Sequence, residues 1–309
     1  MPGGPGESPA VARRRVRLAL RRARHATDPL LSQSDVARRI GWSLSKVQRI
    51  EAGDVTVSGT DLRALLDLYG GFSPEEIEEL VEDARISRRQ RWWTKPEYRE
   101  HLTPAVLKLM GFEAEAAEIR AYQPGVVPAV LQTPETAEAI LGFWNASLTE
   151  KRRVRHDVRA LRQQEIIERE DPPRYYLILD ESVLLRDVGG PKIAAEQMDA
   201  LAAAAQRPAV HIRVVPLARG AFMALLGPFS IVDLDEREGR EPDDADQEDA
   251  VLYREGWNID DITEDHKLVR EHREYFEVLW NQSLDEEVSL RLITARAAVL
   301  RSELDRPDR

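Results

Sequence analysis

The stretch that decides the fold of the N-terminal part is residues 31–53, which read LSQSDVARRIGWSLSKVQRIEAG. Its apolar spacing predicts two short helices, one after Ser32 and one after Ser43, because a serine at the N-cap accepts hydrogen bonds from the first free amides of a helix. Gly41 and Gly53 are expected to end these helices, since glycine adopts the left-handed conformation found there. Two short helices joined by a three-residue turn predict a helix-turn-helix.

Further helices are predicted on both sides of this motif. Apolar residues three or four apart predict helices over Arg13–Ala26 and Asp61–Tyr69, and Ser73-Pro74 is a typical start for a helix that runs toward Arg91. Residues 1–12 are rich in proline and glycine and are expected to form a disordered tail. The N-terminal part is therefore predicted to be all-helical.

Charge is distributed unevenly along the chain. The whole sequence carries a formal charge of -11, but residues 13–50 hold eleven Lys and Arg against two Asp, a local charge of +9 that leaves -20 for the rest. DNA phosphates respond to the charge of the protein surface that faces them, not to the net charge of the whole chain. This asymmetry therefore favours DNA binding by the N-terminal part. The alternative interpretation is a solvated basic helix without a partner.

The second helix of a helix-turn-helix enters the major groove, so its outward residues are candidates for base contacts. Val47 and Ile50 are spaced to face the core. The residues left outside, together with those at the two helix starts, form the predicted DNA-binding set: Gln33, Ser43, Leu44, Ser45, Lys46, Gln48 and Arg49. The alternative is that these are ordinary surface polar residues of a helical bundle.

Each predicted contact follows from the chemistry of the side chain. Arg49 can fork onto guanine O6 and N7, Gln48 can pair with adenine, and Leu44 can pack on a thymine methyl group. Gln33 is placed for a phosphate at a helix start. Arg14 is expected to contact phosphate without regard to sequence.

Beyond Trp92, strands are predicted between the helices. Runs of β-branched and aromatic residues predict strands over Arg174–Leu179, His211–Val215, Phe229–Leu234 and Ala250–Arg254. Helical spacing predicts helices over Glu135–Leu141, Thr149–Glu170, Glu264–Gln282 and Leu284–Leu300. The predicted fold class is mainly α, with an all-α helix-turn-helix part followed by an α+β domain that has a small sheet and closing helices.

One segment of this domain is strongly acidic. Asp235–Asp249 holds nine acids and two arginines and cannot bury apolar area. Its simplest interpretation is a solvated hairpin connection, and the alternative is a decoy for a basic partner.

Several functional classes are excluded by composition and spacing. The absence of cysteine excludes disulfides and thiolate metal sites. The six histidines lack metal-ligand spacing, and the acids Asp180 and Glu181 are expected to point to opposite faces of a strand. No catalytic residue, metal or cofactor is therefore predicted. Apolar runs fall short of the roughly 20 residues of a membrane span, and Met1–Ala12 lacks the apolar core of a secretory signal, so a cytoplasmic location is expected.

The helix-turn-helix is similar to the Xre-type, lambda-repressor-like family. The match runs over Leu31–Ala37 and Gly41–Gly53, and Thr27 to Leu30 looks like an insertion relative to that family. The resemblance implies a structural ion pair between Arg24 and Glu51.

The C-terminal part also resembles a known group. Gln123–Thr133, Arg159–Gln164, Glu181–Leu184 and Val214–Phe229 look like the uncharacterised domain that follows such helix-turn-helix domains in many actinobacterial regulators. The resemblance implies an antitoxin-like transcriptional regulator with a small partner protein encoded nearby.

These observations predict four regions along the chain. They are a disordered tail over 1–12, a helix-turn-helix DNA-binding domain over 13–72, a connecting helix over 73–91 and an α+β regulatory or partner-binding domain over 92–309. Trp92-Trp93 is interpreted as the hydrophobic anchor between the last two.

Three functions compete. The favoured one is a transcriptional regulator that binds a double-stranded DNA operator and uses its C-terminal domain to dimerise or to bind a small protein. The second is a sensor with a small-molecule pocket under Tyr122 to Leu131, and the third is an enzyme with a vestigial DNA-binding domain. A homodimer is expected because specific sites are typically read by two such domains about one helical turn apart.

Overall fold

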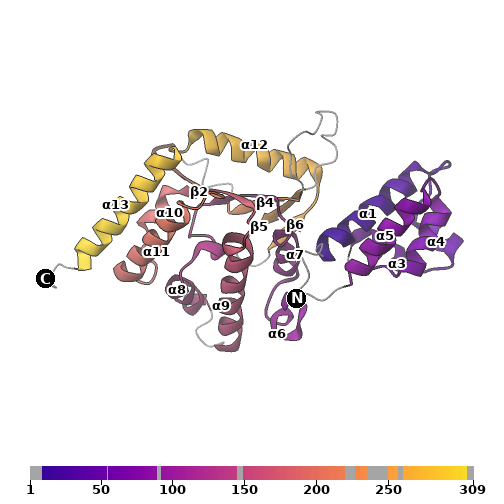
Figure 1. The fold of residues 1–309 in the computed structure, drawn as a ribbon, viewed down its shortest axis with the longest axis horizontal. Helices are drawn as coiled ribbons and strands as arrows, with labels where there is room; N and C mark the ends of the chain where they lie inside the picture. Colours follow the sequence, from indigo (N-terminus) through magenta and orange to yellow (C-terminus); the bar gives the residue numbers. More distant parts are fainter. Residues whose placement is uncertain are drawn as a thin grey trace. The chain divides into compact units, whose positions relative to one another are not determined.

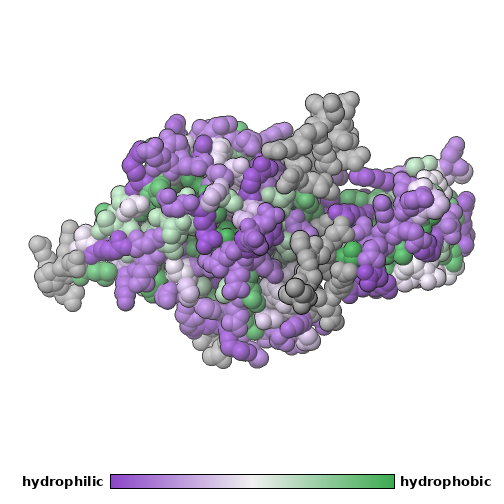
Figure 2. All heavy atoms as spheres, in the orientation of Figure 1, coloured by the Kyte–Doolittle hydropathy of each residue, from purple (hydrophilic) through white to green (hydrophobic). Residues whose placement is uncertain are grey.

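The computed structural model describes residues 9–53, 55–88, 92–144, 149–219, 227–234, 250–256 and 260–304. The chain forms two compact units, a head unit over Met1–Lys95 and a body unit over Pro96–Arg309. Hydrophilic residues cover most of the face of each unit shown in Figure 2, as expected for a chain with 32% charged residues. Within the described ranges, none of the helices combines the length and apolar content needed to cross a membrane. The acidic segment Asp235–Asp249 lies outside the described residues.

The head unit is all-helical. Its helices are α1 (Pro9–Ala26), α2 (Gln33–Ile40), α3 (Leu44–Ala52), α4 (Gly59–Tyr69) and α5 (Pro74–Ile86), followed by the 3-10 turn η1 (Trp92–Thr94). They enclose one core, in which the fully buried side chains include Leu20, Val36 and Leu62. Helix α1 begins inside the segment expected to be a tail, and α5, expected to be a connector, packs against α1 and α4 within this unit.

The ends of α2 and α3 form as the sequence predicts. The side chains of Ser32 and Ser43 accept hydrogen bonds from the backbone N–H groups three residues on, and Gly41 and Gly53 adopt left-handed conformations with φ of 77° each. At Gly53 a side chain would also meet Arg17, because a Cβ atom there would lie 3.1 Å from the Arg17 Cδ. These caps confirm the predicted helix-turn-helix boundaries.

The body unit is built on a six-stranded sheet. The strands are β1 (Glu118–Gln123), β2 (Arg174–Asp180), β3 (Val210–Val215), β4 (Phe229–Asp233), β5 (Ala250–Arg254) and β6 (Asp261–Thr263), in the order β3-β2-β1-β4-β5-β6. β1, β2 and β3 are parallel, with Arg120 paired to Tyr176 and Tyr176 to His211. β4, β5 and β6 continue the sheet in antiparallel fashion.

Helices and short turns complete the body unit. They are α6 (Pro96–Arg99), α7 (Pro104–Glu113), η2 (Ala129–Leu131), α8 (Pro134–Trp144), α9 (Thr149–Gln163), the π-helical turn η3 (Gln164–Glu168), α10 (Glu181–Leu185), α11 (Pro191–Ala204), η4 (Leu217–Arg219), α12 (His266–Gln282) and α13 (Glu286–Leu304). The prediction of an all-α part followed by an α+β part with a sheet and closing helices is confirmed.

The sheet is covered on both faces. Figure 1 shows α12 across one face and α7, α8 and α9 on the other. Under α12 lies an apolar core that includes Tyr122, Phe229 and Phe276. At the edge strand β3, the Val214 N–H donates to the Ser289 hydroxyl at 3.0 Å and the Val214 carbonyl accepts from the Leu284 N–H at 2.9 Å. The start of α13 therefore closes an edge that would otherwise be open to pairing with another chain.

The body-unit elements that were not predicted from the sequence include α6, α7, α10, β1 and β6. The predicted helix over Thr149–Glu170 is α-helical only to Gln163 and then widens into η3. The predicted anchor residues Trp92 and Trp93 pack edge to face with ring centres 5.4 Å apart, and Trp93 is buried.

Candidate nucleic-acid interface

Helix α3, the second helix of the helix-turn-helix, is held in place by a buried ion pair between Arg24 on α1 and Glu51 on α3. The Arg24 guanidinium donates from Nε to Glu51 Oε1 at 2.7 Å and from Nη2 to Glu51 Oε2 at 2.9 Å. Arg24 Nη1 also donates to the carbonyl of Leu31 at 3.0 Å, which ties down the segment between α1 and α2. The hydrogen bond to Glu51 raises the pKa of Arg24 above its ordinary value. The two residues expected to pair do therefore face each other.

Gln33 belongs to the same network. Its side-chain Nε2 donates to Glu51 Oε2 at 2.7 Å, which links the start of α2 to the end of α3. The carboxylate of Glu51 thus has two different partners, and such bidentate, charge-assisted bonds are among the strongest in proteins. Gln33 was predicted to contact a phosphate, and the structure uses one of the two N–H groups of its amide inside the head unit.

The outer face of α3 carries the other predicted contacts. Leu44, with 43% of its surface exposed, lies beside the exposed residues Ser45, Gln48 and Arg49. Arg49 Nε makes a long hydrogen bond of 3.4 Å to the Ser45 carbonyl one turn earlier. Donors, an acceptor and one apolar side chain therefore share a solvent-facing surface, as direct reading of base edges requires. Ser43 is exposed too, and its hydroxyl is used to cap α3.

Lys46 is the exception on this helix. Its Nζ donates to Asp61 Oδ2 on α4 at 2.9 Å and lies 3.6 Å from the centre of the Trp42 ring. Sequence reasoning placed Lys46 among the DNA contacts and did not identify Asp61. The available signal was the pattern Ser58-x-x-Asp61, which marks an acid at the start of α4.

The cations of the head unit are divided between its interior and its surface. Arg14 is only 3% exposed, so the expectation that it contacts phosphate is wrong. Within residues 13–50, the exposed arginines lie instead at other positions of α1, α2 and α3: Arg15, Arg21, Arg22, Arg38, Arg39 and Arg49. The charge seen by DNA is therefore smaller than the +9 counted from the sequence.

In the body unit, the loop after β1 is held by three polar side chains. Gln132 Nε2 donates to the Val127 carbonyl at 2.7 Å, and Gln197 Nε2 donates to the Leu131 carbonyl at 2.8 Å. The Ser182 hydroxyl donates to the Pro124 carbonyl at 3.0 Å. The cavity under this loop measures about 20 Å³, which is room for one water molecule rather than for a metabolite.

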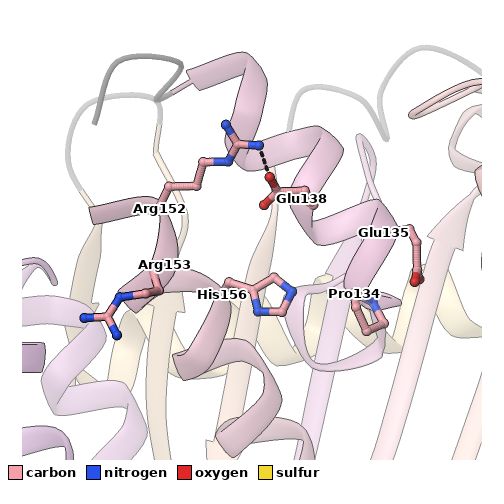
Figure 3. Close-up of a pocket in the computed structure, with 6 residues that line it drawn as sticks. All are labelled: Pro134, Glu135, Glu138, Arg152, Arg153 and His156. Carbon is pink, nitrogen blue, oxygen red and sulfur yellow. Dashed lines mark ion pairs between the residues drawn. The ribbon is translucent and has the colours of Figure 1, made fainter. Parts of the chain in front are cut away.

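A wider groove lies between α8 and α9. It encloses about 560 Å³ and is lined by Pro134, Glu135, Glu138, Arg152, Arg153 and His156. Figure 3 shows Arg152 reaching from α9 to an ion pair with Glu138 on α8, while Arg153 extends away from α8. The groove is open and its charges are of both signs, so it favours no single class of ligand.

The acids considered for catalysis have structural partners. Asp180 Oδ1 accepts from the Ser182 N–H at 2.9 Å and caps α10, and Glu181 Oε2 accepts from the Leu217 N–H at 2.9 Å. Across the described residues, no cluster of three or more His, Asp or Glu side chains could hold a metal ion.

Comparison with known proteins identifies two regions. Residues 15–80 match a helix-turn-helix domain, and residues 106–295 match the domain of unknown function DUF5753. No curated protein and no solved structure matches the chain. Since the second match covers more than half of the sequence, the chain belongs to the DUF5753 family and carries a helix-turn-helix domain ahead of that domain.

Proposed function

We propose that this protein is a sequence-specific DNA-binding transcriptional regulator of the Xre type. The observation that carries the proposal is the construction of α3. Arg24, Glu51 and Gln33 fix the helix from inside, while Leu44, Ser45, Gln48 and Arg49 face solvent. A rigid helix with exposed base-reading side chains is what direct readout in the major groove requires.

The test is selection of bound duplexes from a pool of random DNA by the full-length protein. We expect enrichment of one sequence in two inverted half-sites spaced by about one helical turn, roughly 10 base pairs. Recovery of unbiased sequences at physiological salt would contradict the proposal.

We further propose that two copies bind one operator as a homodimer and that the body unit acts by binding, without chemistry. One head unit covers only a small DNA surface, so specific binding typically needs two head units on two half-sites. This supports the dimer. Light scattering should show a dimer at micromolar concentration, alone or on the selected DNA. A monomer under both conditions would rule this out.

The antitoxin-like role and the small partner protein remain part of this proposal. Resemblance of the body unit to the domain found in such regulators supports them, and the 20 Å³ cavity under the β1 loop gives no support to a small-molecule sensor. A pull-down with the purified full-length protein, followed by mass spectrometry, should recover one small protein in constant ratio.

A further inference from the structure

One ammonium group joins three elements of the head unit. Lys46 on α3 is 2.9 Å from the Asp61 carboxylate in the first turn of α4, and its charge lies 3.6 Å from the centre of the Trp42 ring in the turn before α3. A carboxylate and an aromatic face both attract a cation. Lys46 therefore has two favourable partners at once, both inside the head unit.

The starts of the helices provide a second, independent observation. Ser32 with Asp35 and Ser73 with Glu76 each form a complete capping box, in which the acid side chain accepts from the backbone N–H of the serine. At α4 the first half of the motif is present, because the Asp61 N–H donates to the Ser58 hydroxyl at 3.0 Å. The Asp61 carboxylate binds Lys46 instead of completing the box.

Exposure separates Lys46 from its neighbours on α3. Ser45, Gln48 and Arg49 are exposed. The side chains of Lys46 and Asp61 are partly buried, with 36% and 33% of their surface accessible to solvent. The charge of Lys46 is thus balanced locally, while Arg49, among the residues that the structure describes, makes a long hydrogen bond to a backbone carbonyl.

We propose that Lys46 is a positioning residue and not a DNA contact. By holding Asp61 and Trp42 together it fixes the rotation of α3 relative to α4, and so sets how Ser45, Gln48 and Arg49 face the base edges. The proposal rests on the proposed function, since the orientation of α3 has a measurable consequence only when α3 reads DNA.

Binding of the full-length protein to the selected duplex and to random DNA, measured by fluorescence anisotropy over a range of salt concentrations, tests this. Each phosphate contact contributes about 0.9 to the slope of log K against log salt. Lys46→Met should leave that slope unchanged and reduce the preference for the selected duplex by about tenfold. Lys46→Arg, which can still reach Asp61 and stack on Trp42, should retain the preference.

Asp61→Asn tests the same proposal through a gain of DNA binding instead of a loss. Lys46 released from Asp61 becomes free to contact a phosphate, so the slope should steepen by about 0.9 and binding to random DNA should rise several-fold at low salt. Arg63→Met is the matched control, because it removes a cation of the same unit that pairs on the surface with Glu78. It should change neither the slope nor the preference.

The outcomes separate this inference from the proposed function. If wild-type protein binds its selected duplex and Lys46→Met flattens the slope by about 0.9 and weakens all sequences alike, Lys46 contacts phosphate and the inference alone is wrong. If wild-type protein shows no sequence preference, the proposed function fails and the inference falls with it. Circular dichroism of each variant verifies that the helices are formed.

Discussion

Glu51 is almost fully buried, and its negative charge is balanced by the guanidinium of Arg24. Removing one partner of a buried ion pair leaves an uncompensated charge, which costs about 3 kcal/mol or more. Arg24→Met should therefore lower the unfolding free energy of the head unit by about 3 kcal/mol, with Gln33 as the remaining partner of Glu51. Hydrogen exchange of the α2 and α3 amides measures this. The exposed pair Arg63 with Glu78 is the control, and Arg63→Met should cost less than about 1 kcal/mol.

Arg49 belongs to the residue scale as well, because a single guanidinium can read one guanine. Arg49→Ala should weaken binding to the selected duplex by about 1 to 3 kcal/mol and relax the preference at one base pair of each half-site. Titration of the variant against duplexes changed at single positions shows which base is involved. An equal loss on selected and random DNA would mean that Arg49 contacts only the backbone.

At the scale of helices, the start of α5 predicts a pH dependence. Hydrogen bonds from the Ser73 backbone N–H and then from its hydroxyl hold the pKa of Glu76 below its usual value. A carboxyl with a lowered folded pKa stabilises the fold above its unfolded pKa, and this contribution is lost as the pH falls through the lowered value. Glu76→Gln should therefore lower the melting temperature of the head unit at pH 7, and calorimetry should find that the difference shrinks as the pH falls below the ordinary pKa of a glutamic acid. A difference that stays constant as the pH is lowered would assign the effect to packing.

At the scale of strands, β1 depends on buried charges. Asp233 on β4 accepts from Arg120 of β1 at 2.7 Å and from Arg273 of α12 at 2.7 Å and 3.1 Å. Asp233→Ala leaves two cations without this partner, so the body unit should lose about 3 to 5 kcal/mol. A denaturant titration that follows the fluorescence of Trp280 in the body unit measures the loss. A change below about 1 kcal/mol would show that the arginines find other partners or water.

The ends of α2 and α3 could be predicted from the sequence, whereas strand β1 could not. Ser32, Gly41, Ser43 and Gly53 act through their own backbone neighbours, so the boundaries of α2 and α3 were predictable. β1, read as EIRAYQ, is polar at Glu118, Arg120 and Gln123 although it lies in the middle of the sheet. Glu118 is paired with Arg174 and Arg120 with Asp233, and both partners are distant in sequence, so no local pattern could reveal a buried strand.

The candidate site divides in the same way. The outward positions of α3 follow from helical periodicity, so the exposure of Ser45, Gln48 and Arg49 was predictable. Lys46 shares that periodicity, but its partner Asp61 lies on another helix. Arg14 is basic and near the N-terminus, yet it is buried. Whether an outward or basic residue is free for DNA depends on tertiary contacts that periodicity does not contain.

At the scale of the whole molecule, the two units differ in charge. Residues 1–95 carry a formal charge of +4 and residues 96–309 carry -15. Both units are compact by their internal contacts. A DNA-binding unit joined to an acidic unit has its affinity for phosphate reduced by long-range repulsion, and that repulsion is screened beyond about 10 Å at 0.1 M salt.

The acidic body unit should affect how the head unit binds DNA. Removal of residues 96–309 should leave a folded head unit that binds a single half-site weakly, because the contribution of the second copy is lost. Without the acidic unit, its affinity for random DNA should exceed that of the full-length protein at low salt, and the difference should vanish as salt is raised.

Regulation by a partner requires that the partner bind one arrangement of the full-length protein more tightly than another. Equal affinity for both arrangements would leave the equilibrium between them unchanged. A small protein recovered by pull-down should therefore change the DNA affinity of the full-length protein and leave that of residues 1–95 unchanged. Electrophoretic mobility shifts of both proteins on the selected duplex, with and without the partner, make the comparison. An equal response of the truncated protein would place the regulatory contact in the head unit and contradict a regulatory role for the body unit.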